Sequence, residues 1–191
     1  MARGRPSKKQ LILDTALDLF SKAGFQGTSI DLVVQKAGVS KPTVYNNFPT
    51  KQALLSELIG HLLIRAQTDR DSLLDEQETS TSVLLVSAFQ QIATDPAYLA
   101  LYRIFYGEQY KLDEKTQIQL AQFDQDVNVW VSKLVKQRYP QWDDVAIFML
   151  FAACRELMLT PIMLGQRTGQ DASLRQKVQC YIEILEQQFN R

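Results

Sequence analysis

The side chains of this chain that are best suited to specific chemistry lie between Ser40 and Lys51. Within about two helical turns stand five residues that can donate hydrogen bonds to phosphates and base edges: Lys41, Thr43, Tyr45, Asn46 and Asn47. Ammonium, hydroxyl and amide groups are the groups that proteins place on duplex DNA. Their spacing therefore predicts contact with a nucleic acid.

The residues around this segment predict two short helices joined by a tight turn. Thr28 and Asp31 have the spacing of a capping box for the first helix. Gly38 follows that helix, at a place where helices often end in a left-handed residue. Ser40 is placed to cap the second helix, and Pro42 is tolerated in its first turn. This order of elements is typical of a helix-turn-helix.

The second helix is expected to pack through Val44 and Phe48, which lie four residues apart. Phe48 precedes Pro49 and should end the helix, after which Thr50 caps the next one. The second helix of such a motif lies in the DNA major groove. The residues expected to contact DNA are Ser29, Lys41, Pro42, Thr43, Tyr45, Asn46, Asn47 and Lys51, with Arg3 and Arg5 from the N-terminal tail.

Residues 7 to 60 resemble the DNA-binding domain of TetR/AcrR-type transcriptional regulators. The matching residues are Ala16, Phe20, Gly24, Phe25, Thr28, Ala37-Gly38-Val39-Ser40, Thr43-Val44-Tyr45, Phe48, Lys51 and Leu54-Leu55. Two residues depart from the family pattern and leave the operator sequence open. Asn47 stands where the family often has His or Tyr beside the phosphate backbone, and Asp31 stands where some members carry a base-reading basic residue. The resemblance implies an all-α fold of about nine helices, with an N-terminal three-helix helix-turn-helix domain and a C-terminal helical domain for ligand binding and dimerisation.

The charge of the chain is unevenly distributed although its net value is zero. Residues 1–53 hold eight Lys and Arg against three Asp, a net charge of +5, so the remainder carries −5. A basic module on an acidic body is the electrostatic pattern of a protein that binds a polyanion. In the tail, Arg3-Gly4-Arg5-Pro6 resembles an AT-hook that lies in a narrow minor groove. A tail with only general phosphate attraction is the equal alternative.

Composition argues against several classes of protein. The 191 residues include one His and two Cys, and they show no cysteine cluster, P-loop or dinucleotide fingerprint. We therefore expect no catalytic residues, no metal and no cofactor, so that the chain is not an enzyme. No apolar region follows the N-terminal basic residues, and the longest apolar run, Val145 to Cys154, is too short to cross a bilayer. A soluble protein of the bacterial cytoplasm, associated with the nucleoid and with no membrane partner, is expected.

The helix expected from Val145 to about Leu159 is apolar on every side and must be buried on every side. One face can line the body's core while the other meets a second subunit. The last helix, 173–189, carries an apolar stripe as well, and two such helices from each of two subunits would form a four-helix interface. The residues assigned to this homodimer interface are Phe148, Phe151, Leu174, Val178, Ile182 and Leu185.

The body also carries aromatic and methionine residues that suit an adaptable small-molecule cavity, although ordinary core packing is the more frequent explanation for any one of them. The residues assigned to such an effector site are Tyr102, Phe105, Phe123, Trp130, Met149, Arg155 and Met158. Arg155 and Glu156 interrupt an apolar helix, and buried charges need partners. Pairing within the chain, across a dimer or with a ligand stays open.

These observations predict a DNA-binding domain at 1–60 and an effector-binding and dimerisation domain at 61–191. The predicted function is a homodimeric transcriptional regulator, a repressor that a small, mostly apolar effector releases from a partly palindromic operator in double-stranded DNA. One alternative is a DNA-binding protein controlled by a protein partner. Another is a scaffold with a degenerate helix-turn-helix, against which the intact Thr43, Tyr45 and Lys51 argue.

Overall fold

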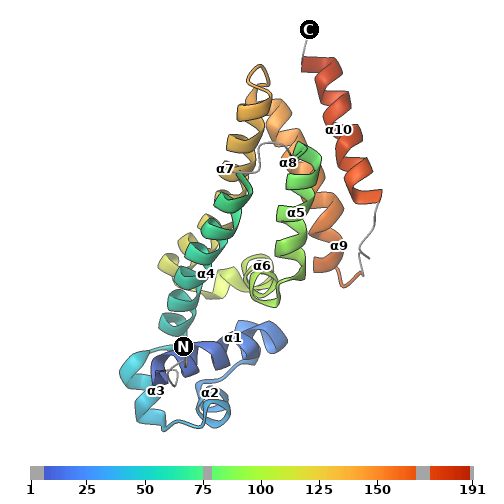
Figure 1. Cartoon of the computed structure of the whole chain (residues 1–191). Helices are drawn as coiled ribbons and strands as arrows, with labels where there is room; N and C mark the ends of the chain where they lie inside the picture. Colours follow the sequence, from blue (N-terminus) through green and yellow to red (C-terminus); the bar gives the residue numbers. More distant parts are fainter. Residues whose placement is uncertain (1–6, 75–78, 167–172, 190–191) are drawn as a thin grey trace, which may run out of the picture. The chain divides into compact units, whose positions relative to one another are not determined.

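The structure is a computed structural model that describes residues 7–74, 79–166 and 173–189, and all regular secondary structure in these ranges is helical. The predicted all-α fold is thus confirmed. The elements are, in order, α1 Lys8–Gly27, α2 Ile30–Ala37, α3 Lys41–Asn47, α4 Lys51–Leu74, α5 Thr81–Thr94, α6 Pro96–Glu108, η1 Gln109–Lys111, α7 Glu114–Arg138, α8 Asp144–Met158, α9 Thr160–Met163 and α10 Ser173–Phe189. Figure 1 labels the ten α-helices of the described ranges. The short elements η1 and α9 were not predicted separately.

The chain divides into two compact units. The first unit contains the residues up to Ile64 together with Pro96–Gln122, and the second contains Arg65–Asp95 and the residues from Phe123 onward. The first unit's N-terminal segment ends close to the domain boundary expected at residue 60. The segment 96–122, which the sequence pattern assigned to the body, packs with that N-terminal segment instead.

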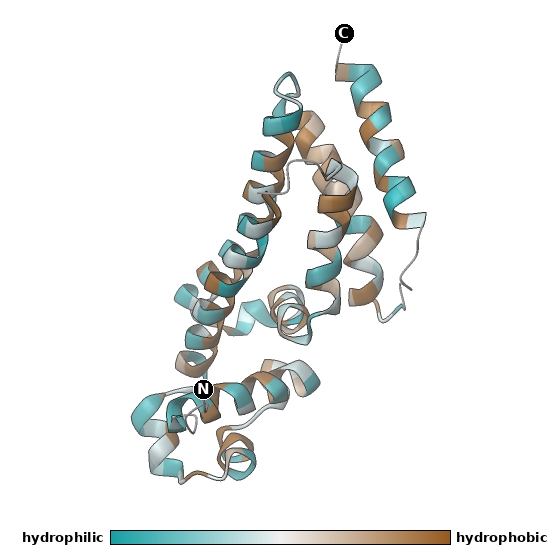
Figure 2. Ribbon diagram, viewed as in Figure 1, coloured by the Kyte–Doolittle hydropathy of each residue, from teal (hydrophilic) through white to brown (hydrophobic). Residues whose placement is uncertain are grey.

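The core of the first unit is built from the inward faces of α1 to α4. Teal and brown alternate along α1 in Figure 2, as expected for a helix with one buried face. Ser7 caps α1 by accepting a hydrogen bond from the backbone N–H of Gln10 at 3.1 Å. Helix α6 packs on α1, and the Ser21 hydroxyl donates to the carbonyl of Pro96 at 3.3 Å. The buried apolar residues of α1 to α4 in this unit include Ile12, Leu13, Ala16, Phe20, Val33, Ala37, Val44, Phe48, Leu54, Leu55 and Leu58.

The core of the second unit includes the packing of α5, α8 and α10 against one another. Asp143 caps α8 by accepting from the N–H of Ala146 at 2.9 Å, and the rings of Phe89 and Phe151 lie 6.1 Å apart. The buried residues of α8 and α10 are Ala146, Ile147, Leu150, Phe151, Cys154, Met158, Leu174, Val178, Ile182 and Leu185.

This packing corrects the interface assigned from sequence. Five of its six residues are buried in the chain's own core, namely Phe151, Leu174, Val178, Ile182 and Leu185. Phe148 alone of the six is exposed, at 62%. The reason is that α10 packs on one face of α8 within the same chain. The apolar stripe of α10 is therefore already buried and is not available to a second subunit. The apolar residues left exposed on α8 and α10 are Val145, Phe148, Met149, Tyr181 and Ile184; together they form what we call the α8–α10 apolar face.

Among the described residues, one helical stretch, Asp144–Met163, is long and apolar enough to cross a membrane by length and composition. The uninterrupted apolar run Val145 to Cys154 was predicted to be too short to cross a bilayer. The apolar helical stretch is longer than this run, because it continues beyond the charged residues Arg155 and Glu156. Of the most apolar window in this stretch, 39% is buried inside the chain. Within the second unit, α8 packs against α5 and α10.

Candidate nucleic-acid interface

Helices α2 and α3 form the helix-turn-helix that the sequence predicted. Gly38 ends α2 in the left-handed conformation, with φ 62° and ψ 32°, which costs a glycine little. Ser40 caps α3, and its hydroxyl accepts from the N–H of Thr43 at 3.3 Å. The cap at the start of α2 differs from the prediction.

Ser29, and not Thr28, caps α2. The Ser29 hydroxyl accepts from the N–H of Leu32 at 3.1 Å, whereas the Thr28 side chain is buried and donates to the carbonyl of Gly24 at 2.9 Å. A buried threonine hydroxyl that is bonded backward to α1 cannot cap the next helix. Contact between Ser29 and DNA stays a prediction.

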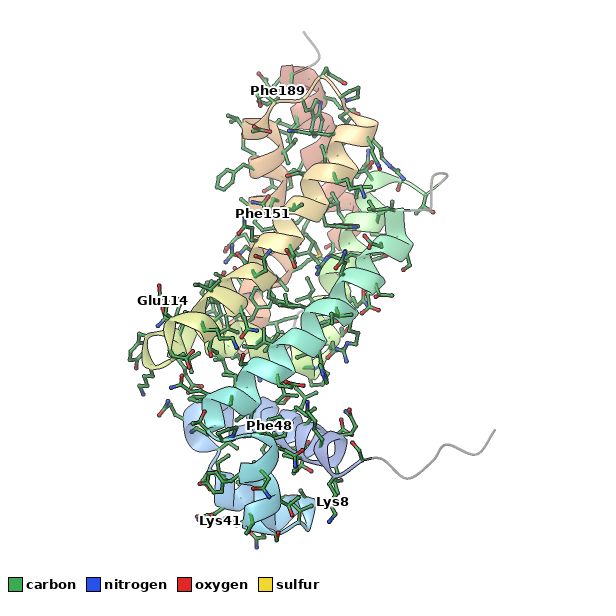
Figure 3. The ribbon with its side chains drawn as sticks, turned by 90° about the vertical axis from the view of Figure 1, so that its left-hand side faces the viewer. Lys8, Lys41, Phe48, Glu114, Phe151 and Phe189 are labelled. Carbon is green, nitrogen blue, oxygen red and sulfur yellow. The ribbon has the colours of Figure 1, made fainter. Side chains whose placement is uncertain are left out.

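Helix α3 has a buried side and an exposed side. Val44 is fully buried and Phe48 is 2% exposed, so the helix is fixed to the unit through these two residues. The exposed residues of α3 are Lys41, Pro42, Tyr45, Asn46 and Asn47. In Figure 3 Phe48 lies near the start of α4, while Lys41 lies at the opposite end of α3. The exposed side is the one that the sequence assigned to DNA.

Two of the residues assigned to DNA also make bonds within α3. Thr43 is half-buried, and its hydroxyl lies 2.8 Å from the Ser40 hydroxyl. The Asn47 side-chain amide donates to the carbonyl of Thr43 at 2.8 Å. Both side chains are therefore held against the helix, and base or phosphate contacts would have to share or replace these bonds. Tyr45, at 42% exposure, is the large aromatic side chain on this side.

Lys51 does not face outward as expected for a phosphate contact. Its ammonium group donates to the carbonyls of Phe25 at 2.8 Å and Thr28 at 2.9 Å, and it lies 4.2 Å from the centre of the Phe25 ring. Burial lowers the pKa of Lys51, and the nearby Glu108 carboxylate partly opposes this. Lys51 thus joins the start of α4 to the junction of α1 and α2, and its contact with a phosphate stays a prediction.

Glu108, at the end of α6, also binds the junction of α1 and α2. Its two carboxylate oxygens accept from the N–H groups of Phe25 at 3.1 Å and Gln26 at 2.7 Å. These N–H groups become free because Gly24 leaves the helical region, with φ 72° and ψ 178°. Bonds from backbone N–H to a carboxylate are stronger than neutral ones. Glu108 thus binds backbone N–H donors, and Lys51 binds backbone carbonyl acceptors, of the same segment at the end of α1. This segment leads directly into the helix-turn-helix.

Asp31 and Lys41 connect the two helices of the motif on its exposed side. The Lys41 ammonium lies 2.7 Å from an Asp31 carboxylate oxygen, with the side chains 53% and 72% exposed. The hydrogen bond and the charge of Asp31 raise the pKa of Lys41. Lys41 is therefore charged at neutral pH and already has an acidic partner in the free chain.

The residues assigned to an effector fall in both units. Tyr102 is buried and Phe105 half-buried in the first unit, while Phe123, Trp130 and Met158 are buried in the second. Met149 is 51% exposed, so its assignment to an enclosed cavity is corrected; it belongs to the α8–α10 apolar face. Arg3 and Arg5 lie outside the described residues.

The partner of Arg155 is now identified. Its guanidinium lies 3.5 Å from a carboxylate oxygen of Asp124 on α7, so pairing within the chain explains this charge, while Glu156 is exposed. On the same helix as Asp124, the Trp130 indole N–H donates to the carbonyl of Arg70 at 2.9 Å. These two contacts join α7 to α8 and to the end of α4.

The first unit also has an open groove of about 560 Å³ along α4 and the start of α7. Its lining is mostly polar and includes Glu57, His61 and Lys115, but none of the residues assigned to an effector. Within the described ranges, no group of three or more His, Cys, Asp or Glu side chains is arranged to hold a metal ion. The exposed side of α3 is therefore the candidate site that the geometry supports best.

Residues 12–58 match the family model of bacterial regulatory proteins of the tetR family. Over these residues the chain is similar to the DNA-binding region of TetR-family regulators. The chain is 40% identical over 62 residues to the HTH-type transcriptional regulator RutR of Escherichia coli K12, a match that covers 32% of this chain and 29% of RutR. It is 35% identical over 74 residues to the HTH-type transcriptional regulator YvkB of Bacillus subtilis 168, covering 39% of this chain and 36% of YvkB.

The fold of the chain is shared by a solved TetR/AcrR-family transcriptional regulator from Aquifex aeolicus VF5. The TM-score is 0.69 at 22% identity, over 94% of this chain and 99% of that one. The matches to RutR and YvkB span about a third of each relative's length, and both relatives are transcriptional regulators.

Sequence reasoning missed Glu108 and the role of Gly24. Glu108 is 82 and 83 residues away from the amides that it binds, and no local pattern relates it to them. From the sequence, Gly24 was identified as one of the residues that match the family pattern. The glycines Gly24 and Gly27 lie three residues apart just before Thr28, and this spacing indicated a turn with positive φ. It gave no indication that the distant Glu108 carboxylate binds this turn.

Proposed function

We propose that this chain is a sequence-specific DNA-binding transcriptional regulator, with DNA contact through residues 1–60 and effector binding and dimerisation through residues 61–191. The observation that supports this most directly is the exposed side of α3. Lys41, Tyr45 and Asn46 are exposed there while Val44 and Phe48 anchor the helix. Side chains that are not needed for folding are thereby available to base edges and phosphates. A cytoplasmic, nucleoid-associated protein fits this function.

Replacing Tyr45 with alanine is expected to weaken operator binding roughly tenfold, because one base or phosphate contact carries about 1–3 kcal/mol. Tyr45 is 42% exposed, so the melting temperature should change little. Fluorescence anisotropy with a duplex selected by the wild-type protein measures the affinity. Tyr110→Ala is the matched control, since Tyr110 is 72% exposed on η1. Equal affinities for the Tyr45 and Tyr110 variants would remove α3 as the DNA-binding helix.

We further propose a homodimer formed through the α8–α10 apolar face. Val145, Phe148 and Ile184 are 54–62% exposed, although large apolar side chains favour burial. A two-fold dimer presents two α3 helices, and two half-sites about 34–36 Å apart, or a multiple of this, would match them. A partly palindromic operator follows from this symmetry.

A small, mostly apolar effector that releases the protein from its operator is the third part of the proposal, and it makes the regulator a repressor. Phe123, Trp130 and Met158 of the second unit supply aromatic and thioether surface of the kind that lines adaptable cavities. A ligand shifts the protein between two states only by its different affinity for them.

The effector is expected to bind operator-bound protein less tightly than free protein, by the same factor, about 5–150-fold, by which it weakens DNA binding. Small molecules that copurify with the protein, identified by mass spectrometry, are titrated by calorimetry with and without operator DNA. The copurified compound titrated against a Trp130→Ala variant serves as the control for the site. Equal affinities with and without operator would instead favour control by a protein partner.

A further inference from the structure

The ion pair of Asp31 and Lys41 is the most exposed pairing of opposite charges between the two helices of the motif. The ammonium and carboxylate atoms lie 2.7 Å apart, yet both side chains keep more than half of their surface in solvent. An exposed pair of this kind contributes little to stability. Its donor and its acceptor remain free to make further hydrogen bonds on their outer sides.

The ion pair lies at the N-terminal end of α3, the part of a helix-turn-helix that contacts base edges. Lys41 is the first residue of α3, and Asp31 lies in the first turn of α2. In a helix-turn-helix the N-terminal residues of the second helix contact base edges in the major groove. Lys41 lies at the end of α3 remote from Phe48, the residue that anchors the helix (Figure 3). A base pair facing this end would meet a cation and an anion side by side.

A G·C base pair is the complement of such a pair of charges. Guanine presents two adjacent acceptors, N7 and O6, and cytosine presents the N4 amino donor next to them. The O6 and N4 atoms are joined by a Watson–Crick N–H···O bond and so lie about 2.9 Å apart. The Lys41 and Asp31 atoms lie 2.7 Å apart. Lys41 can therefore donate to guanine while Asp31 accepts from cytosine.

An A·T base pair fits these two side chains less well. Its donor, the adenine N6 amino group, lies between two acceptors, adenine N7 and thymine O4, and the thymine methyl group follows. A carboxylate placed on that donor meets acceptors on both sides. Asp31 also repels phosphates, which disfavours a purely backbone contact for Lys41. Both effects favour a G·C base pair at this position.

We infer that Asp31 and Lys41 act together as the reader of one G·C base pair in each half-site, Lys41 donating to guanine O6 and N7 and Asp31 accepting from cytosine N4. This inference rests on the proposed function and adds to it a base pair and the two side chains that select it. In this arrangement Asp31 supplies specificity and reduces affinity for unrelated DNA.

The test is selection from a duplex library with a randomised core, using the full chain as wild type, Asp31→Asn and Asp18→Asn. Asp18→Asn is the matched control, because Asp18 also forms an exposed ion pair, in this case with Lys22. Both substitutions remove one negative charge, so they change the net charge by the same amount. We expect one G·C position per half-site in the wild-type selection. Its enrichment should fall at least about fivefold with Asp31→Asn and should not change with Asp18→Asn. Asp31→Asn should also bind an unrelated duplex several-fold more tightly.

A second variant keeps the test independent of how well Asp31→Asn folds. Lys41→Gln should lose the guanine preference at the same base pair. The inference is overturned if Asp31→Asn keeps the wild-type base preference at every position, or if it only strengthens binding to all sequences alike. A wild-type protein that enriches no sequence would overturn the proposed function together with the inference, so the two failures are distinguishable.

Discussion

Replacing Gly24 with alanine is expected to lower the free energy of unfolding by about 3 kcal/mol and to abolish operator binding. The backbone at Gly24 has φ 72° and ψ 178°, a region that is essentially restricted to glycine. A Cβ atom there would also lie 2.5 Å from a Glu108 carboxylate oxygen. Alanine would therefore strain the chain and displace the carboxylate that binds the amides of Phe25 and Gln26.

Gly60→Ala is the matched control for this prediction. Gly60 lies within α4, and a Cβ atom there would meet nothing within 4 Å, so alanine should stabilise the chain by about 0.4–1 kcal/mol. Guanidinium unfolding followed by circular dichroism gives both values. A Gly24→Ala, Glu108→Ala double variant should lose less stability than the sum of the two single changes, because the clash is absent. Equal unfolding midpoints for Gly24→Ala and Gly60→Ala would contradict the role assigned to Glu108.

A Phe148→Glu, Ile184→Glu double variant is expected to be a monomer at micromolar concentration and to lose about 10²–10⁴-fold in operator affinity, because linked binding of two half-sites is lost. Phe148 and Ile184 are 62% and 54% exposed on the α8–α10 apolar face. Two carboxylates in a closed interface would be buried without partners. Light scattering measures the mass, and anisotropy measures the affinity.

The control for the dimer prediction is an apolar residue of equal exposure elsewhere. Ile118 on α7 is 61% exposed, and Ile118→Glu should leave mass and affinity unchanged. The double variant must also keep its helical content, since both residues lie outside the core. A wild-type chain that is itself a monomer, or a double variant that remains a dimer, would exclude this face as the interface.

The features of the candidate site that could be predicted from sequence are those set by residues close together in the chain. Gly38, Ser40 and Thr50 act within three or four residues of their own position, and the structure shows a left-handed turn and two caps there. Val44 and Phe48 were predicted to be buried from their spacing alone. The helical fold was predicted for the same reason, since capping residues and apolar periodicity are local signals.

The directions of single side chains could not be predicted in the same way. Lys51 was predicted to contact phosphates because it follows the motif, but in the chain itself its ammonium group donates to two carbonyls and lies over the Phe25 ring. On α8, apolar residues occur on every side, so periodicity did not show that Phe151 faces the core while Phe148 faces solvent. Contacts between distant segments decide such directions, and sequence spacing does not report them.

The bonds from Glu108 to Phe25 and Gln26 have a consequence for the order in which the chain acquires structure during synthesis. The first unit is discontinuous, and its last segment ends at Gln122. While the ribosome is still making the residues between Ile64 and Pro96, the amides of Phe25 and Gln26 lack the acceptor that they have in the folded protein. The helix-turn-helix leaves the ribosome first but is completed late, because closure of this long loop must precede its last contacts. During synthesis, the segment at the end of α1 therefore gains these two bonds only after Glu108 has been translated.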